Sequence, residues 1–422
     1  MRGNGAVNES RLETSRRCIV CEMETVEQFL DLGSTALANK FLTQEELSAP
    51  ELQYPLRVGF CHTCGHVQLT ERVPPSVMFE EYLYVSSASD TLKAHFCDLS
   101  DLLVQRYHLG AADLVIDIGC NDGTLLHGFK RHGVKTLGVD PAANLAQFTS
   151  TMGIERYTGF FNAKTARHIV SEWGQAALIT ATNTFPHIPD LQDFIAGIKI
   201  ALAPNGVFVI EMHYLVDLLE QGAFDTIYHE HVSYWALTPI VRLFEKHGMR
   251  VVHAERVPLH HGQLRVSVQR RGEGEVQPSV ERILDMERIQ GIGQFKTYRQ
   301  FALKTQQIKQ DLHSTIATLR EQGKRVVGYG APAKGNTLLS FLEIGPETLE
   351  YIADRSPLKQ GLYTPGMHIP VVPPERLLAA DRPDYVLLLA WNFTDEILEQ
   401  QAEYRRCGGQ FIIPVPEVRI LS

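Results

Sequence analysis

The chain has 422 residues, 44% of them hydrophobic and 21% charged, and this size suits two or three globular domains with sizeable cores. Its formal net charge of −9 argues against a nucleic-acid partner, because a surface that tracks phosphates needs clustered lysine and arginine. No apolar run approaches the ~20 residues of a membrane span, the polar N-terminus carries no signal peptide, and seven cysteines do not make a secreted disulfide scaffold at this length, so we expect a cytoplasmic protein.

Four of the cysteines lie in the first segment, residues 1–75, as two Cys-x-x-Cys pairs: Cys18 with Cys21, and Cys61 with Cys64. Each pair can bind one edge of a tetrahedral metal ion. Four thiolates would fill the coordination shell and leave no position for water or substrate. We therefore predict a structural zinc ion that folds a zinc-binding module, with buried unpaired thiols or a redox pair as the alternatives.

Residues 76–277 alternate between helical and strand patterns. A helical stretch ends at Gly110, and the apolar run Leu114–Ile118 then indicates a buried parallel strand that is followed by a helix. Further strands are expected at residues 135–140, 176–183 and 206–212. Strands that alternate with helices indicate an α/β domain with a doubly wound sheet.

The loop after the first of these strands reads GCNDG. A dinucleotide site would want a glycine where Asn121 stands, so that the backbone could approach a pyrophosphate. Asp140, at the end of the next strand, is well placed to accept hydrogen bonds from two ribose hydroxyls. The combination favours the S-adenosylmethionine (SAM) site of a class I methyltransferase over a purely structural turn. The predicted cofactor-binding residues are Asp117, Gly119, Asn121, Gly123, Asp140 and Asn183.

Residues 278–422 begin with a mostly helical stretch, expected to bridge domains, and continue as a second α/β pattern. There GYGAPAKG follows a strand and opens a helix, so its backbone N–H groups could receive a phosphate. Lys334 adds charge for a diphosphate, and Asp354 resembles a ribose contact. The alternatives are an NAD site, which the proline and lysine of the loop disfavour, and a purely structural duplicate.

Residues 228–235, YHEHVSYW, show neither the alternation of a strand nor the stripe of a helix, and we expect a loop. Together with the cysteine pairs, EYLYVSSAS, DIGCNDGTLL, NTFPHIPDL, GYGAPAKGNTLL and LLLAWNF, this stretch resembles the zinc-containing sugar C-methyltransferases, which act on nucleotide-linked 4-keto deoxysugars. The resemblance runs nearly end to end. It implies a zinc-binding module, a central SAM domain and a C-terminal Rossmann-like domain, with the nucleotide-sugar between the last two.

The resemblance also implies roles for single residues. His231 matches the family's base, with Tyr228 and Glu230 beside it, while His187 and either Tyr82 or Tyr84 complete the catalytic set. In the segment HHGQLR the family commonly shows His-Gly-Gly-Ser-Leu-Arg, so His261 and Gln263 are departures, as is Trp235 for a phenylalanine. The predicted substrate-binding residues are Lys334, His260, Gln263, Arg265 and Asp354.

The chemistry explains these residue types. Methylating a carbon requires that the carbon first become a nucleophile, and a neighbouring ketone allows this by holding the charge as an enolate. Such a site needs a base near neutrality, for which His231 is suited, and a donor to the oxyanion, supplied by Tyr228, Tyr84 or His187. Glu230 would orient a histidine or hold a sugar hydroxyl.

We therefore predict a SAM-dependent C-methyltransferase of deoxysugar and natural-product biosynthesis, including antibiotics. It would carry structural zinc, take a nucleotide-sugar or related small molecule as substrate, and be a monomer or weak dimer without nucleic-acid or membrane partners. The sequence leaves open an O- or N-methyltransferase, an NAD-dependent nucleotide-sugar oxidoreductase and a non-catalytic nucleotide-sugar-binding scaffold.

Overall fold

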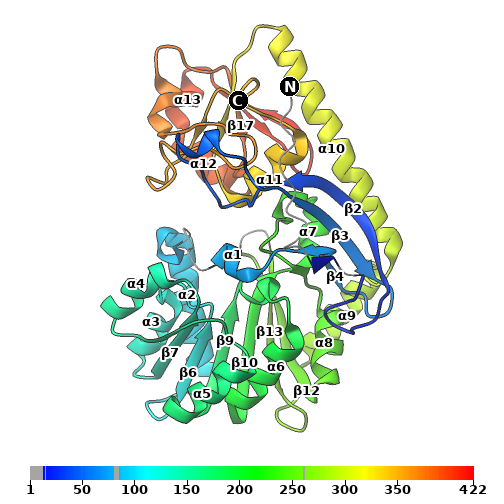
Figure 1. Ribbon diagram of the computed structural model, residues 1–422, viewed down its shortest axis with the longest axis vertical. Coiled ribbons are helices and arrows are strands. Elements are labelled where there is room, and N and C mark those ends of the chain that lie inside the picture. Colours follow the sequence, from blue (N-terminus) through cyan, green and yellow to red (C-terminus); the bar gives the residue numbers. More distant parts are fainter. Residues whose placement is uncertain (1–12, 15, 80–84, 260–261) are drawn as a thin grey trace.

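The computed structural model describes residues 13–14, 16–79, 85–259 and 262–422. The described strands form four sheets, of two, four, seven and six strands. Figure 1 shows the helices and strands of the central segment in the lower part of the molecule and those of the C-terminal segment in the upper part, with the long helix α10 (Phe295–Glu321) along one side. No helix within these ranges has the length and apolar character needed to cross a bilayer.

A small antiparallel sheet, in the order β11-β4-β3-β2, joins the first segment to the middle of the chain. Three strands come from the first segment: β2 (Val26–Thr35), β3 (Tyr54–Cys61) and β4 (Val67–Leu69). The fourth, β11 (Ser233–Tyr234), belongs to the stretch expected to be a loop, so that expectation is wrong for these two residues. The Leu69 N–H also donates to the Val232 carbonyl at 3.0 Å. The first segment thus holds the histidine-rich stretch directly.

Two further strands belong to the first segment, and a short helix follows it. β1 (Glu13–Thr14) pairs with β5 (Glu71–Arg72), and α1 (Pro75–Phe79) leads toward the seven-stranded sheet.

The seven-stranded sheet has the order β12-β13-β10-β9-β6-β7-β8. Only β13 runs antiparallel to its neighbours among these described strands. The bounds are β12 (Met249–Val257), β13 (Gln263–Arg270), β10 (Leu202–His213), β9 (Ala176–Thr182), β6 (Leu114–Ile118), β7 (Lys135–Asp140) and β8 (Glu155–Thr158). The strand order reverses between β6 and β9, and ligands of such sheets bind at this switch point, outside the carboxyl ends of the strands.

Helices cover both faces of this sheet, which explains the continuous apolar run of β6. Val115 belongs to one core cluster with Phe96 of α2 (Asp90–Tyr107), whereas Ile116 belongs to another with Phe194 of α6 (Leu191–Ala201). Alternate residues of a strand point to opposite faces, so both must be apolar here. The predicted doubly wound α/β architecture is confirmed. The remaining helices are α3 (Thr124–Arg131), α4 (Ala146–Thr151), α5 (Ala163–Trp173), α7 (Leu215–Gln221) and α8 (Leu237–Lys246).

The C-terminal segment forms a second, smaller α/β unit after α9 (Pro278–Ile289) and α10. Its sheet has the order β16-β15-β14-β17-β18-β19, parallel except for β19. The strands are β16 (Val371–Val372), β15 (Ile352–Ala353), β14 (Val326–Tyr329), β17 (Tyr385–Leu388), β18 (Gln410–Ile413) and β19 (Arg419–Leu421). The helices are α11 (Ala333–Leu342), α12 (Thr394–Gln400) and α13 (Ala402–Arg406). GYGAPAKG lies at the switch point between β14 and β17.

Replacing Glu287 of α9 tests how this bridging helix is held against α8. This carboxylate is 1% exposed and accepts hydrogen bonds from the N–H groups of Leu237 and Thr238, the Thr238 hydroxyl and the Tyr214 hydroxyl, at 2.6–2.9 Å. It therefore caps the N-terminus of α8. We expect Glu287→Ala to lower the free energy of unfolding by about 3 kcal/mol, because buried donors lose a charged acceptor. Thermal denaturation beside Glu281→Ala, an exposed change on the same helix, checks this; equal melting temperatures for the two variants would contradict it.

Candidate active site

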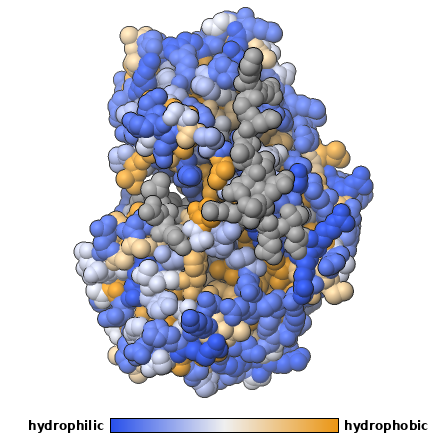
Figure 2. Space-filling model, viewed as in Figure 1, coloured by the Kyte–Doolittle hydropathy of each residue, from blue (hydrophilic) through white to orange (hydrophobic). Residues whose placement is uncertain are grey.

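A cavity of about 440 Å³ lies where the three parts of the chain meet. The glycine loop and the carboxyl ends of β7 and β9 line one side, the segment around residues 213–231 lines another, and the start of α11 closes it from the C-terminal unit. Asn39 reaches it from the first segment, and Phe79 reaches it from α1, which follows that segment. In Figure 2, hydrophobic side chains gather at the waist of an otherwise largely hydrophilic face.

The glycine loop is shaped by close packing against the end of β9. Gly119 has φ +76°, and a Cβ there would lie 2.0 Å from Thr184 Oγ1, so only glycine fits. Asn121 also adopts a left-handed backbone, with φ 50°. Its N–H donates to Asp140 Oδ2 at 2.9 Å, and its Oδ1 accepts from the Ser86 N–H at 3.0 Å. The turn is thus held open toward the cavity.

Two buried carboxyl groups and one amide face this turn. Burial raises the pKa of Asp117 to about 7, against a hydrogen bond of 2.7 Å from the Thr180 hydroxyl. Burial also raises the pKa of Asp140, whose Oδ1 accepts from Ala142 N–H at 2.8 Å and from Arg156 at 3.2 Å. Asn183 Oδ1 is buried without a hydrogen-bond partner in the described chain. These acceptors fit a ligand that brings its own donors, as the ribose hydroxyls and the ammonium group of SAM would.

Five of the six predicted cofactor residues line the cavity. The exception is Gly123, which precedes α3 with φ +85° and lies against Thr149 and Ile154.

Asp140 gives a direct test of the cofactor site. We expect Asp140→Asn to weaken SAM binding by about 10–100-fold, because one oxygen becomes an NH₂ group that can accept neither from a ribose hydroxyl nor from the loop. Isothermal titration with SAM measures this. The matched control is Asp98→Asn, an exposed carboxylate on α2. A folded Asp140→Asn protein that binds SAM as tightly as the control would remove Asp140 from the site.

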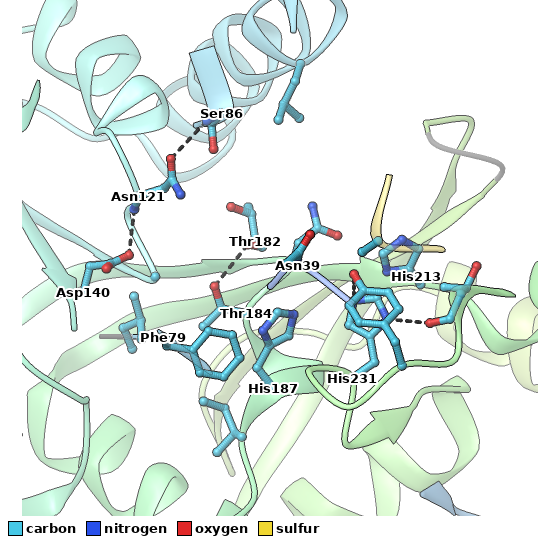
Figure 3. A pocket seen from close by; sticks show the side chains of 18 of the residues that line it. Asn39, Phe79, Ser86, Asn121, Asp140, Thr182, Thr184, His187, His213 and His231 are labelled. Atoms are coloured by element: carbon cyan, nitrogen blue, oxygen red, sulfur yellow. Dashed lines mark hydrogen bonds between the residues drawn. The ribbon is translucent and has the colours of Figure 1, made fainter. Parts of the chain in front are cut away.

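Three histidines gather at the other end of the cavity (Figure 3). The ring of His231 lies with its centroid 5.2 Å from that of His187 and 5.0 Å from that of His213. His231 and His187 were predicted, whereas His213 was missed. The signal that could have found it is its position as the last residue of β10, at the carboxyl edge of the sheet.

Hydrogen bonds fix the tautomer of His231. Its Nδ1 lies 2.8 Å from the Thr226 carbonyl oxygen, which can only accept, so Nδ1 carries the proton. Nε2 is then the nitrogen with the free electron pair, and the Tyr228 hydroxyl, 3.0 Å away, donates to it. Burial lowers the pKa of His231 to about 4, and burial together with the charge of His231 lowers the pKa of His187 well below its ordinary value. Both rings are therefore neutral at pH 7.

Glu230, another predicted catalytic residue, is not among the described residues that line the cavity. It is 5% exposed and accepts from Asn39 Nδ2 at 2.7 Å. Tyr82 and Tyr84 lie outside the described residues, as do His260 and His261.

The C-terminal unit contributes two lysines to the cavity wall. Lys334 lies over the Trp391 ring, 4.3 Å from its centroid, and Trp391 Nε1 donates to Asp225 Oδ2 at 2.6 Å. Burial lowers the pKa of Lys334 to about 8, with the Asp225 charge opposing the shift. Lys359, which the sequence did not single out, donates to the Ala331 carbonyl at 2.8 Å. The pair supplies positive charge at this end of the cavity.

Three predicted substrate-binding residues are not among the described residues that line the cavity. Arg265 instead binds Glu211 at 2.6 Å, and Glu211 is also 2.5 Å from His95 Nε2, which makes a buried hydrogen-bond network. Asp354 accepts from the Ala331 N–H at 2.6 Å and shapes the GYGAPAKG turn. Gln263 is fully buried on β13, opposite His213 of β10. Arg265 and Asp354 are thus engaged within the domain framework, whereas the amide of Gln263 is buried without a hydrogen-bond partner among the described residues.

Trp235, the other departure noted above, also packs in the core. It is fully buried, and its ring lies 4.8 Å from that of Phe185 and 4.4 Å from that of His66.

The four predicted metal ligands come together. The sulfur atoms of Cys18, Cys21, Cys61 and Cys64 all lie within 4.8 Å of one another, and the closest pairs are 3.5 Å apart. A tetrahedral zinc with Zn–S bonds of about 2.3 Å requires sulfur atoms roughly 3.8 Å apart. Gly65 supports the second knuckle with φ +78°. The donor set fits a closed zinc site with no position for water.

Comparison with known proteins agrees with this organisation. Models of three families match: "Putative zinc binding domain" at residues 18–79, "Methyltransferase domain" at 93–254 and "C-methyltransferase C-terminal domain" at 258–416. The C-methyltransferase NovU of Streptomyces niveus is 38% identical over 406 residues, which cover 96% of each chain.

Solved structures share only part of the fold. The PH0226 protein of Pyrococcus horikoshii matches 44% of this chain and 95% of its own, at 14% identity and TM-score 0.35. The 1,6-didemethyltoxoflavin-N1-methyltransferase of Burkholderia thailandensis, whose structure contains S-adenosylhomocysteine, matches 42% of this chain and 79% of its own, at 17% identity and TM-score 0.32. Values this low carry no functional argument. The 38% identity to NovU over nearly the full length of both chains does carry such an argument. It shows that the chain belongs to the family of C-methyltransferases that includes NovU.

Proposed function

We propose that this C-methyltransferase binds SAM at the glycine loop and methylates a carbon beside the ketone of a nucleotide-linked 4-keto deoxysugar, with dTDP as the nucleotide. The observation that carries the proposal is that one cavity joins three features: a cradle of acceptors, a hydrogen-bonded His–Tyr pair and two lysines. Bound SAM would supply an electrophilic methyl group. The product would belong to deoxysugar and natural-product biosynthesis.

His231 is proposed as the base. Its Nε2 holds the free electron pair and would receive the proton from the carbon beside the ketone, directly or through the Tyr228 hydroxyl that bridges to it. The electron pair of the broken C–H bond moves toward the ketone oxygen. The resulting enolate carbon would form the new C–C bond to the methyl group of SAM while the S–CH₃ bond breaks, and S-adenosylhomocysteine would leave. Because burial makes His231 a weaker base than a free histidine, the site must stabilise the enolate.

A donor to the enolate oxygen meets that need. His187 and Tyr228 both line the cavity beside His231. One preorganised donor in a site without water is worth roughly 2.7–4 kcal/mol in the transition state.

The two lysines are proposed to bind the diphosphate. Lys334 and Lys359 line the part of the cavity formed by the C-terminal unit, across from the glycine loop. This supports a division of the chain into a zinc-binding module (1–75), a SAM domain (76–277) and bridging helices with a Rossmann-like nucleotide-sugar domain (278–422). Cys18, Cys21, Cys61 and Cys64 would hold one structural zinc ion.

A panel of nucleotide-linked 4-keto sugars, incubated with SAM and followed by mass spectrometry, tests the proposal. We expect at least one sugar to gain the mass of one CH₂ group, and its proton NMR spectrum to show a methyl group on carbon. A methoxy or N-methyl signal would instead support an O- or N-methyltransferase. Titration with NAD in place of SAM tests the oxidoreductase alternative.

A further inference from the structure

The zinc-binding module contributes a side chain to the cavity. The segment between β2 and β3 passes the methyltransferase and C-terminal units, and Asn39 lies in it. Asn336 of α11, itself 2% exposed, donates from Nδ2 to the Ala38 carbonyl at 2.7 Å. Leu42 and Tyr363 exchange two backbone hydrogen bonds, of 3.0 and 2.9 Å. The segment is thus fixed on both sides of Asn39.

The orientation of the Asn39 amide is also fixed. Nδ2 donates to Glu230 Oε1 at 2.7 Å, and the acceptor is a carboxylate buried to 5% exposure. A carboxylate only accepts, so the NH₂ group of Asn39 must be the side that faces Glu230. This leaves Oδ1 for other partners.

Oδ1 of Asn39 is accessible from the cavity. Asn39 lines the cavity. Its Oδ1 has no hydrogen-bond partner among the described residues, and it is not one of the polar atoms that are buried from solvent without a partner. An amide that donates to a charged acceptor has a more strongly polarised carbonyl. Asn39 (Figure 3) therefore presents a fixed and strengthened hydrogen-bond acceptor, and its amide is held by Glu230.

We propose that Asn39 is a specificity-determining residue that accepts a hydrogen bond from a sugar hydroxyl of the substrate, and that Glu230 acts through Asn39 by fixing its amide. This inference rests on the proposed function, because it assigns a contact to the same sugar. A hydroxyl donates one hydrogen bond, which matches the acceptor, whereas a deoxy carbon leaves the acceptor unpaired. The zinc-binding module then takes part in choosing the substrate.

The test uses the full-length, zinc-loaded enzyme and the keto-sugar that it methylates best. We expect Asn39→Ala to raise KM for the sugar about tenfold, with kcat and the dissociation constant of SAM within about twofold of wild type. Lys40→Ala, an exposed neighbour, is the matched control. Glu230→Ala should raise KM at least as much, and the double variant should cost nothing further, because the two side chains act as one unit.

Analogues of that sugar that lack one ring hydroxyl provide the second measurement. Wild type should prefer the hydroxylated sugar over one such analogue about tenfold in kcat/KM, and Asn39→Ala should abolish that preference. An unchanged KM in Asn39→Ala, additive losses in the double variant, or a preference that survives the substitution would overturn the role of Asn39 while wild-type methylation stands. If wild type methylates no keto-sugar, the proposed function fails and this inference fails with it.

Discussion

Replacing His231 with alanine should lower kcat by about 10²–10⁴, the usual effect of losing a general base. The ligands should still bind, because the glycine loop and the two lysines, not His231, are the proposed contacts for SAM and the diphosphate. SAM affinity, measured by titration, and KM should therefore change little. His127→Ala, an exposed change on α3, is the control.

Proton exchange separates the base from residues that only support it. With S-adenosylhomocysteine in place of SAM, wild type should incorporate deuterium from solvent at the carbon beside the ketone, and His231→Ala should not. Tyr228→Phe should slow exchange without abolishing it if the phenol relays the proton to Nε2, 3.0 Å away. Exchange at the wild-type rate in His231→Ala would move the role to His187 first.

The pH profile of the wild-type enzyme is a further test of His231 as the base. A base must be unprotonated to act, so kcat/KM falls as pH is lowered through the pKa of His231 in the free enzyme. Burial lowers that pKa to about 4. We expect kcat/KM to stay level as pH falls through 6.5, where an ordinary histidine is protonated, and to decline only toward pH 4. A midpoint near 6.5 would show that the base is a more exposed group.

The features that were predictable from sequence are those encoded locally. The apolar run Leu114–Ile118 predicts a strand covered on both faces. The glycine loop and the start of the next helix follow it directly in the sequence, so they can be predicted without knowing the rest of the fold. The cysteine spacing similarly brings two ligands together within each pair. Cofactor and metal residues therefore follow from short stretches of sequence.

Residues brought in by tertiary contacts were not predictable in this way. Asn39 and Lys359 reach the cavity from segments with no local signal, because their positions depend on how three units pack. Arg265 lies in a motif of the resemblance, but the structure pairs it with the buried Glu211 on the neighbouring strand, a contact that no local pattern indicates. Short strands could not be predicted for a related reason. β11 has only two residues, and it forms because it pairs with β4.

Removing the zinc ion is expected to unfold the first segment and inactivate the enzyme. Structural zinc in small domains contributes about 10–16 kcal/mol of apparent binding energy at pH 7, as much as the whole stability of many domains. Elemental analysis of the wild-type protein should find one zinc per chain. The same analysis of Cys64→Ser, which lacks a buried ligand, should find no zinc. Limited proteolysis should then cleave within residues 18–79, whereas Cys407→Ser, an exposed thiol outside the cluster, should resist like wild type.

Loss of zinc should disturb the positions of the histidines more than the structure of the cofactor site. β4 pairs with β11, and the Leu69 N–H holds the Val232 carbonyl, next to His231; the glycine loop has no such tie to the cysteine sheet among the described backbone contacts. Metal-free protein should therefore lose methyl transfer and deuterium exchange while the SAM dissociation constant changes by less than about tenfold. A metal-free enzyme that still exchanges the sugar proton at the wild-type rate would show that the module and the base are independent.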